Sequence, residues 1–199
     1  MSFKDFTLED LKIKFGTSNK VKQLFDDIKP LEPSELLSLI LKENLKIPLR
    51  TEKAKSEFIV APILTELKRR NNDFFTLYSG EVLNADKKTG LFGECDFIIS
   101  KNTDTFDMNC PIFSVVEAKK NDIDIGIPQC CAQMVGIQVF NKRHLENIDT
   151  IYGCVTTVDE WKFLKLKDNN IIIDSNVYYF NKLEDILGVF QFIIDFYKT

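Results

Sequence analysis

The chain has 199 residues, 44% of them hydrophobic, and a formal net charge of −4. This length favours one domain with at most an appendage, and the composition is that of a soluble protein with a substantial core. The acidic balance argues against a general nucleic-acid coat protein, which would be basic overall. It is compatible with a nuclease, whose metal-binding carboxylates contribute negative charge and whose basic patches can be local.

The sequence indicates a cytoplasmic protein with no membrane partner. No apolar run approaches the roughly 20 residues that a membrane span requires, and the charged N-terminus lacks the apolar core of a signal peptide. The five cysteines include no Cys-x-x-Cys pair, which favours reduced thiols. A zinc site is not expected, because the cysteine spacings do not suit one and the chain has a single histidine.

Residues 1–50 are predicted to form a helical N-terminal extension, and residues 51–199 the main domain. Pro33 and Ser34 mark the start of a helix with leucines at helical spacing. A further helix is predicted over 51–72. Pro62 lies inside this pattern and marks either a helix start or a kink.

The periodicity then changes to that of strands, with helices after the third and the sixth. A loop is expected at 101–109, and a connector at 121–128 leads to the first of these helices, with Pro128 near its first turn. The predicted elements are strands at 73–83, 91–100, 110–120, 150–158, 160–168 and 170–180 and helices at 129–143 and 182–198. This order predicts an α/β protein with a central mixed β-sheet and helices on both faces.

The third predicted strand ends in an unusual arrangement of charge. Residues i and i+2 of a strand point to the same side, so Glu117 and Lys119 share a face while Ala118 points away. After a buried apolar run, this pair must either emerge at the strand end or be buried together. A structural ion pair at the sheet edge is the simplest alternative to a functional role.

The preceding strand offers a second carboxylate. If the two strands are antiparallel neighbours, Asp96 lies beside Glu117. Two carboxylates suit Mg²⁺ or Mn²⁺, which prefer oxygen ligands and keep waters for a substrate phosphate. The Ala118 carbonyl can supply another oxygen, and Lys119 can position a water or stabilise charge on a phosphate oxygen.

Asp96 followed by Glu117-Ala118-Lys119 at a strand end resembles the signature of the PD-(D/E)XK nuclease superfamily, which has the restriction-endonuclease-like fold. Among its members, the chain resembles the nuclease domains at the N-terminus of type I restriction enzyme R subunits. The resemblance covers about residues 51–160. It implies a core made of a helix, a mixed sheet and a helix that crosses over after the Glu-x-Lys strand.

The resemblance also implies further site residues. Such families often carry a metal-binding glutamate on the first core helix, a role that Glu57 fits and Glu66 fits less well. Many carry a glutamine on the helix after the Glu-x-Lys strand, for which Gln129 and Gln133 are both candidates and Gln133 is preferred.

The implied function is Mg²⁺- or Mn²⁺-dependent phosphodiester hydrolysis of DNA, by a nuclease of restriction, repair or mobile-element type. Asp96 and Glu117 would hold the metal, with support from Glu57. The alternative is a catalytically silent nuclease-fold module that binds nucleic acid or a protein partner. A homodimer is compatible with the first function, because two such sites would cut both strands.

Overall fold

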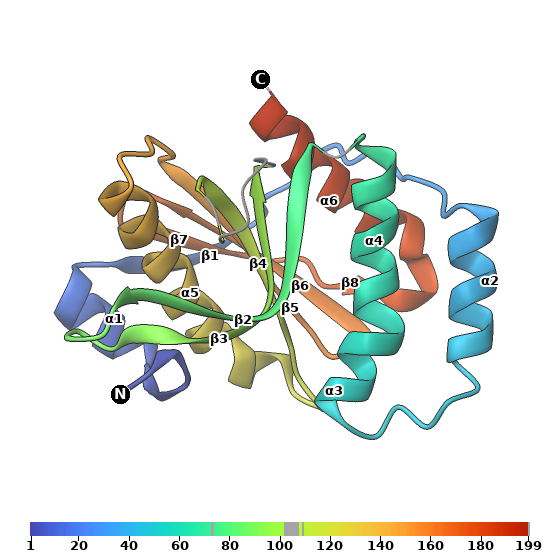
Figure 1. The fold of residues 1–199 in the computed structure, drawn as a ribbon, viewed down its shortest axis with the longest axis horizontal. Helices are drawn as coiled ribbons and strands as arrows, with labels where there is room; N and C mark the ends of the chain where they lie inside the picture. The colour runs from blue at the N-terminus through green and yellow to red at the C-terminus, as the bar shows by residue number, and fades with distance from the viewer. Residues whose placement is uncertain (73, 102–107, 109, 199) are drawn as a thin grey trace.

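The computed structural model describes residues 1–72, 74–101, 108 and 110–198. Within these ranges, strands and helices alternate in the order that the periodicity predicts from residue 51 onwards (Figure 1). The elements are η1 (Phe3–Asp5), α1 (Leu8–Phe15), β1 (Ser18–Lys22), α2 (Glu35–Asn44), α3 (Glu52–Lys55), the π-helical turn η2 (Ser56–Val60), α4 (Ala61–Arg70), β2 (Phe75–Asp86), β3 (Leu91–Lys101), β4 (Ile112–Ala118), α5 (Ile123–Arg143), β5 (Thr150–Thr156), β6 (Glu160–Lys167), β7 (Asn170–Asp174), β8 (Tyr178–Tyr179), η3 (Phe180–Lys182) and α6 (Leu183–Lys198).

The strands of the described ranges form one mixed, eight-stranded sheet in the order β1-β7-β6-β5-β4-β3-β2, with β8 paired to β6. The pairs β1–β7 and β4–β5 are parallel, and the other pairs are antiparallel. Helix α5 forms the crossover between β4 and β5. Two parallel neighbouring strands need a long connection that crosses one face of the sheet. Helix α5 makes this connection, and it starts close to the end of β4.

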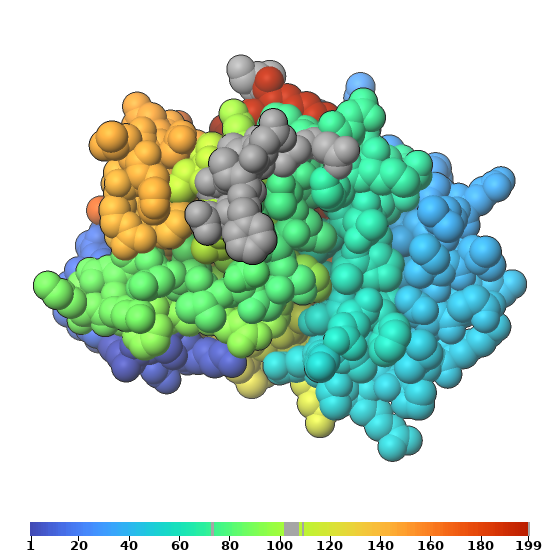
Figure 2. Space-filling model, viewed as in Figure 1, coloured from blue at the N-terminus to red at the C-terminus, as the bar shows by residue number. Residues whose placement is uncertain are grey.

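Helices cover both faces of the sheet, as the sequence predicts (Figure 1). One core lies between the sheet and α5, and a second lies between the sheet and helices α4 and α6. Helix α2 packs outside α4, and the two together form the right side of the molecule in the space-filling view (Figure 2). None of the helices in the described ranges combines the length and the apolar character that crossing a bilayer requires.

The first 50 residues are helical only in part, which corrects the prediction. Strand β1 lies inside this segment and pairs in parallel with β7, although all five of its side chains are exposed. An edge strand of this kind needs only the backbone of its neighbour, so its sequence SNKVK carries no apolar alternation. The predicted helix after Pro33 is confirmed as α2, and the Ser34 hydroxyl caps it by accepting from the Leu37 N–H.

The predicted helix over 51–72 is interrupted by the π-helical turn, and Pro62 follows as the second residue of α4. Proline has no N–H, so it cannot bond the carbonyl of Phe58 four residues earlier. The Asn44 side-chain amide meets this carbonyl instead, with Nδ2 2.7 Å from the Phe58 oxygen. Pro62 therefore both starts α4 and follows a local distortion, and α2 compensates for it.

Strand β2 runs three residues beyond its predicted end, and β4 is two residues shorter at each end than predicted. Two larger differences concern α5 and the last predicted strand. Helix α5 begins at Ile123 rather than at 129, because Asp122 caps it and Ile123 packs into the core; Pro128 consequently lies inside the helix. The predicted strand 170–180 is divided into β7 and β8, since the Asp174 carboxylate accepts from the Asn176 N–H and turns the chain. The expected loop at 101–109 lies largely outside the described residues.

Candidate active site

A bulge in β4 determines which face the Glu-x-Lys residues occupy. Ser100 pairs with Ile112 and Ile99 pairs with Ser114, so Phe113 is an extra residue without a partner on β3. Beyond the bulge, Val115 packs on the α5 side and Val116 on the other. Glu117 and Lys119 therefore face α5, which is the helix that carries both candidate glutamines.

Glu117 and Lys119 form a buried pair, as one of the two sequence alternatives requires. Their side chains are 3% and 11% exposed, and the Lys119 Nζ lies 2.7 Å from Glu117 Oε1. The Lys119 backbone N–H donates to the Thr156 carbonyl on β5 at 2.7 Å, which continues the parallel β4–β5 pairing past the strand end. The lysine side chain itself lies against α5, as its contact with Gln129 shows.

Both glutamines of α5 contact Glu117. Gln129 Nε2 donates to Glu117 Oε1 at 2.5 Å, and its own Oε1 accepts from the Lys119 Nζ at 3.0 Å. Gln133 Nε2 donates to the other carboxylate oxygen, Oε2, at 2.7 Å. The sequence preferred Gln133 to Gln129, but the structure gives each of them a contact with Glu117. Gln129 bonds both Glu117 and Lys119, and Gln133 bonds the second carboxylate oxygen.

One atom of this arrangement has no partner. Within the described ranges, Gln133 Oε1 is the only fully buried side-chain nitrogen or oxygen without a hydrogen bond. Such orphaned groups are costly and mark a strained or functional position, or the place of a water or ion.

Asp96 lies beside the Glu117–Lys119 pair. Strands β3 and β4 are antiparallel with Phe97 opposite Val116, as expected, so Asp96 continues the row next to Glu117. Its Oδ2 accepts from the Ala118 N–H at 2.7 Å, which ties the carboxylate to the backbone between the acid and the lysine. We call Asp96, Glu117, Lys119, Gln129 and Gln133 the Glu117 cluster.

The two carboxyls of the cluster hold unusual proton affinities. Burial, together with the nearby charge of Asp96, raises the pKa of Glu117 to about 7, although Lys119 and Gln133 act in the opposite direction. Burial also raises the pKa of Asp96, against the hydrogen bond from Ala118 and the charge of Lys119. A cation bound beside these two carboxyls would stabilise the ionised form of each and lower both pKa values.

Glu57 extends from the π-helical turn and is exposed, with Lys53 at 3.7 Å. It lines a cavity of about 450 Å³ whose wall also includes Asp96. The charged lining also includes Lys53, Lys4 from the N-terminal segment, Glu52 and Glu94. The first core helix thus brings Glu57 toward Asp96 without a direct contact to Glu117.

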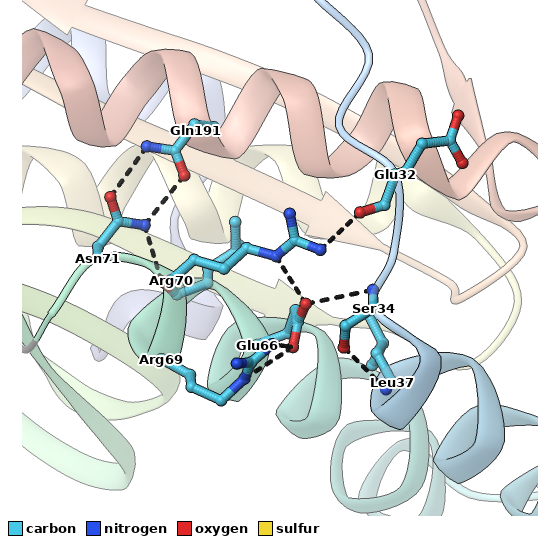
Figure 3. A network of polar contacts seen from close by, with 9 residues as sticks. Glu32, Ser34, Leu37, Glu66, Arg69, Arg70, Asn71 and Gln191 are labelled. Carbon is cyan, nitrogen blue, oxygen red and sulfur yellow. Dashed lines mark hydrogen bonds and ion pairs between the residues drawn. The ribbon is translucent and has the colours of Figure 1, made fainter.

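Glu66, the second candidate on this helix, belongs to a different network. Its carboxylate accepts from Arg69 and Arg70 of α4 and from the backbone N–H of Ser34 (Figure 3). Arg70 also donates to the Glu32 carbonyl at 2.6 Å, so the network fastens the segment before α2 to α4. We call Ser34, Glu66, Arg69 and Arg70 the Glu66 cluster.

Two side chains of α3 make three hydrogen bonds near the site that were not anticipated from the sequence. The Lys55 Nζ donates to the carbonyls of Thr157 and Lys120, and Glu52 Oε1 accepts from the Lys120 N–H at 3.3 Å. Helix α3 is therefore fastened across the ends of β4 and β5. A lysine and a glutamate in a charged helix carry no sequence signal for this role, because their partners are backbone atoms.

Few side chains of the site could bind a metal ion. Among residues 1–72, 74–101, 108 and 110–198, no three His, Cys, Asp or Glu side chains group closely enough to hold an ion. Asp96 and Glu117 supply two carboxylates, and Mg²⁺ commonly uses one or two together with waters and substrate phosphate. The donor chemistry thus fits a hard cation with an incomplete protein shell.

The thiols near the cluster do not suit nucleophilic chemistry. Cys95, Cys130 and Cys154 are buried, and burial raises the pKa of each thiol well above its usual range. The charge of Glu117 acts in the same direction on Cys95 and Cys130. A neutral buried thiol is a poor nucleophile.

Comparisons of this chain with protein-family models, curated proteins and solved structures find no match. Any functional assignment therefore depends on the chemistry of the site itself.

Proposed function

We propose that this chain hydrolyses phosphodiester bonds of DNA with Mg²⁺ or Mn²⁺. The observation that carries the proposal is the buried Glu117–Lys119 pair with the Asp96 carboxylate bonded to the backbone between them. The arrangement of α4, the antiparallel strands β2 to β4, the crossover helix α5 and the parallel strand β5 supports a restriction-endonuclease-like core.

Asp96, Glu117 and the Ala118 carbonyl are the residues that would hold the ion, with Glu57 supporting it directly or through a water. The ion would supply a nucleophilic water at neutral pH and neutralise charge on the phosphate. The raised pKa values of both carboxyls support this role, because a bound cation relieves the cost of keeping them ionised.

Lys119 performs the second part of the chemistry. Its ammonium has three donor hydrogens, and Glu117 and Gln129 use two of them. The third can orient the attacking water or stabilise the charge that develops on a phosphate oxygen. Gln129 and Gln133 hold the Glu117 carboxylate in one orientation, so they act as positioning residues.

Cleavage of labelled single-stranded, duplex and branched DNA, with Mg²⁺, Mn²⁺ or chelator, tests the proposal. Wild type should cut at least one form only with metal, and Asp96→Asn and Lys119→Ala should not cut it. Lys120→Ala is the matched control: this neighbouring lysine is exposed, and it bonds Lys55 and Glu52 through its backbone carbonyl and N–H. Wild-type rates for Lys119→Ala would exclude the mechanism.

Metal binding can be measured separately from cleavage. A ligand that binds only the folded state stabilises it, by about 2.7 kcal/mol at a hundredfold excess over Kd. Mg²⁺ or Mn²⁺ should therefore raise the melting temperature of wild type more than that of Asp96→Asn. Equal shifts would show that the ion binds elsewhere.

A second candidate is a catalytically silent module of the same fold that binds nucleic acid or a protein. The three hydrogen bonds that the Glu117 carboxylate already accepts and the lack of a three-residue metal group in the described ranges favour it. It predicts DNA binding that is unchanged in Asp96→Asn, with no metal-dependent cleavage of any DNA form.

A further inference from the structure

The first turn of α5 packs on the lysine of the candidate site at Gly126. A Cβ built on this glycine would lie 2.9 Å from Lys119 Cγ and 3.3 Å from Lys119 Cε. It would also lie 2.4 Å from Val155 Cγ1 on β5. Real Cβ atoms are not found so close to other carbons, so only glycine allows the helix to sit at this depth.

The same helix face carries both glutamines of the site. Gly126, Gln129 and Gln133 are spaced i, i+3 and i+7, and they therefore share one stripe of α5. Glycine is a poor helix former, and the backbone of Gly126 is helical rather than left-handed. Its presence is therefore explained by close approach to the sheet rather than by backbone conformation.

The lysine side chain needs such a constraint. Its four-carbon stem is flexible and loses considerable entropy when it is fixed in one geometry. Its ammonium nevertheless lies between Glu117 Oε1 and Gln129 Oε1, at 2.7 and 3.0 Å. Gly126 lies against this stem between Cγ and Cε, as the distances from a Cβ built on it show.

We propose that Gly126 is a positioning residue of this site: by lacking a side chain, it lets α5 clamp the Lys119 stem and aim its ammonium between Glu117 and Gln129. The consequence for cleavage rests on the proposed function, but the placement of Lys119 does not. Substitution with alanine forces either the stem outward or the first turn of α5 away from β5. Both movements open Lys119 to solvent.

Chemical labelling tests the placement without any assay of activity. The folded protein is acetylated briefly with an amine-reactive ester, and the modified fraction at each lysine is measured by mass spectrometry. Lys119 should be protected in wild type, with the exposed Lys120 as an internal reference. Gly126→Ala should raise the labelling of Lys119 severalfold, and wild-type protection in this variant would overturn the proposal.

Gly136→Ala is the matched control, because it introduces the same atom in the same helix. Its Cβ would lie 2.8 Å from the Phe3 ring, away from the Glu117 cluster. This variant should lose stability but keep Lys119 protected. If both alanine variants expose Lys119 equally, the effect is general loosening of α5 and the proposal fails.

A double variant separates the two contacts of Gly126. Adding Val155→Ala to Gly126→Ala removes the tighter clash and leaves the clash with the lysine stem. We expect a partial recovery of melting temperature while Lys119 stays labelled. Recovery of both properties would show that the effect runs through Val155, which contradicts the proposal.

Cleavage adds a readout that distinguishes this inference from the proposed function. If wild type cuts DNA, Gly126→Ala should lower the rate at saturating metal by about 100-fold, the cost of a misplacement near 1 Å. If wild type does not cut DNA but the labelling results hold, the proposed function fails and the placement of Lys119 stands. If wild type cuts and Gly126→Ala cuts equally, the positioning role fails.

Discussion

Two buried glutamates of this protein are built in opposite ways. Glu66 lies in the Glu66 cluster with two arginines and a backbone N–H around it (Figure 3). Among the residues that the structure describes, no second carboxylate bonds these arginines. Glu117 has one lysine, two neutral amides and the nearby charge of Asp96. Both side chains are 3% exposed, so burial alone does not distinguish them.

The pKa values show the consequence. Burial acts to raise the pKa of Glu66, but the hydrogen bonds from Arg70, Arg69 and Ser34 outweigh it and the pKa is lowered. For Glu117 the lysine and the amides do not compensate for burial and for Asp96, and the pKa rises to about 7. In the Glu66 cluster, the arginines therefore more than balance the charge of the single carboxylate. In the Glu117 cluster, one lysine faces two carboxyls, and perturbed groups of this kind are common at sites that bind or react.

Cleavage should give the largest contrast between the two clusters. Glu117→Gln removes a proposed metal ligand and should lower the metal-dependent rate by about 100-fold or more. Glu66→Gln should keep the wild-type rate at temperatures where it remains folded. Single-turnover cleavage of the preferred DNA measures both, and loss of activity in the folded Glu66→Gln protein would contradict the division of roles.

Stability should show the reverse order. Glu66→Gln removes the negative charge and turns one of the two acceptor oxygens into a donor, so one arginine loses its acceptor. The loss should be about 2 kcal/mol, below the usual range for a buried pair because Arg69 is 55% exposed. Glu117→Gln should cost less than about 1 kcal/mol, since it removes repulsion from Asp96 and the unpartnered Gln133 Oε1 can accept the new amide N–H after a flip. Urea unfolding without metal compares the two variants, and a larger loss for Glu117→Gln would reverse this interpretation.

The pH dependence of unfolding should separate the two glutamates in direction. The folded pKa of Glu117 is raised, so the folded state binds more protons and stability falls as pH rises from about 4.5 to about 7. The folded pKa of Glu66 is lowered, so its contribution is present above pH 4.5 and is lost on acidification below it. Unfolding free energies are measured against pH in metal-free buffer. The fall in stability between about pH 4.5 and about pH 7 should disappear in Glu117→Gln, and the loss below pH 4.5 should be smaller in Glu66→Gln.

The smallest effect concerns the helix cap inside the Glu66 cluster. Ser34→Ala removes the hydroxyl that caps α2 but keeps the backbone N–H that bonds Glu66, so it should cost about 1 kcal/mol. The exposed Ser38 of α2 offers the matched control, because Ser38→Ala removes a hydroxyl from the helix interior and should change stability little. Thermal melts resolve the two, and a similar loss in both would show that the cap contributes nothing.

The sequence predicts the candidate site more closely than it predicts the fold around it. Alternation places Glu117 and Lys119 on one face, and the antiparallel β3–β4 pair places Asp96 beside them, both as expected. The sequence favours Glu57 over Glu66 for the metal-binding role on the first core helix, although both lie on one predicted helix. In the structure the arginines of α4 bind Glu66 in a separate network, and Glu57, on the π-helical turn, lines the cavity that Asp96 also lines.

Strand β1 illustrates what periodicity does not detect. Its five exposed residues carry no apolar pattern, and only the backbone of β7 makes them a strand. The early start of α5 was missed for a related reason. Asp122 caps the helix in a segment that contains Gly126 and Pro128, both of which disfavour helices locally, while tertiary packing against β5 favours the helix.

By itself, the sequence determined the order of most elements and the grouping of an acid and a lysine at the end of β4, because both follow from local periodicity. Only the tertiary structure decided which face they occupy. The extra residue Phe113 sends Val115 and then Glu117 toward α5, and Gly126 admits that helix to the depth at which its glutamines reach the carboxylate. A bulge and a close helix approach depend on partners distant in the chain, so no local pattern encodes them.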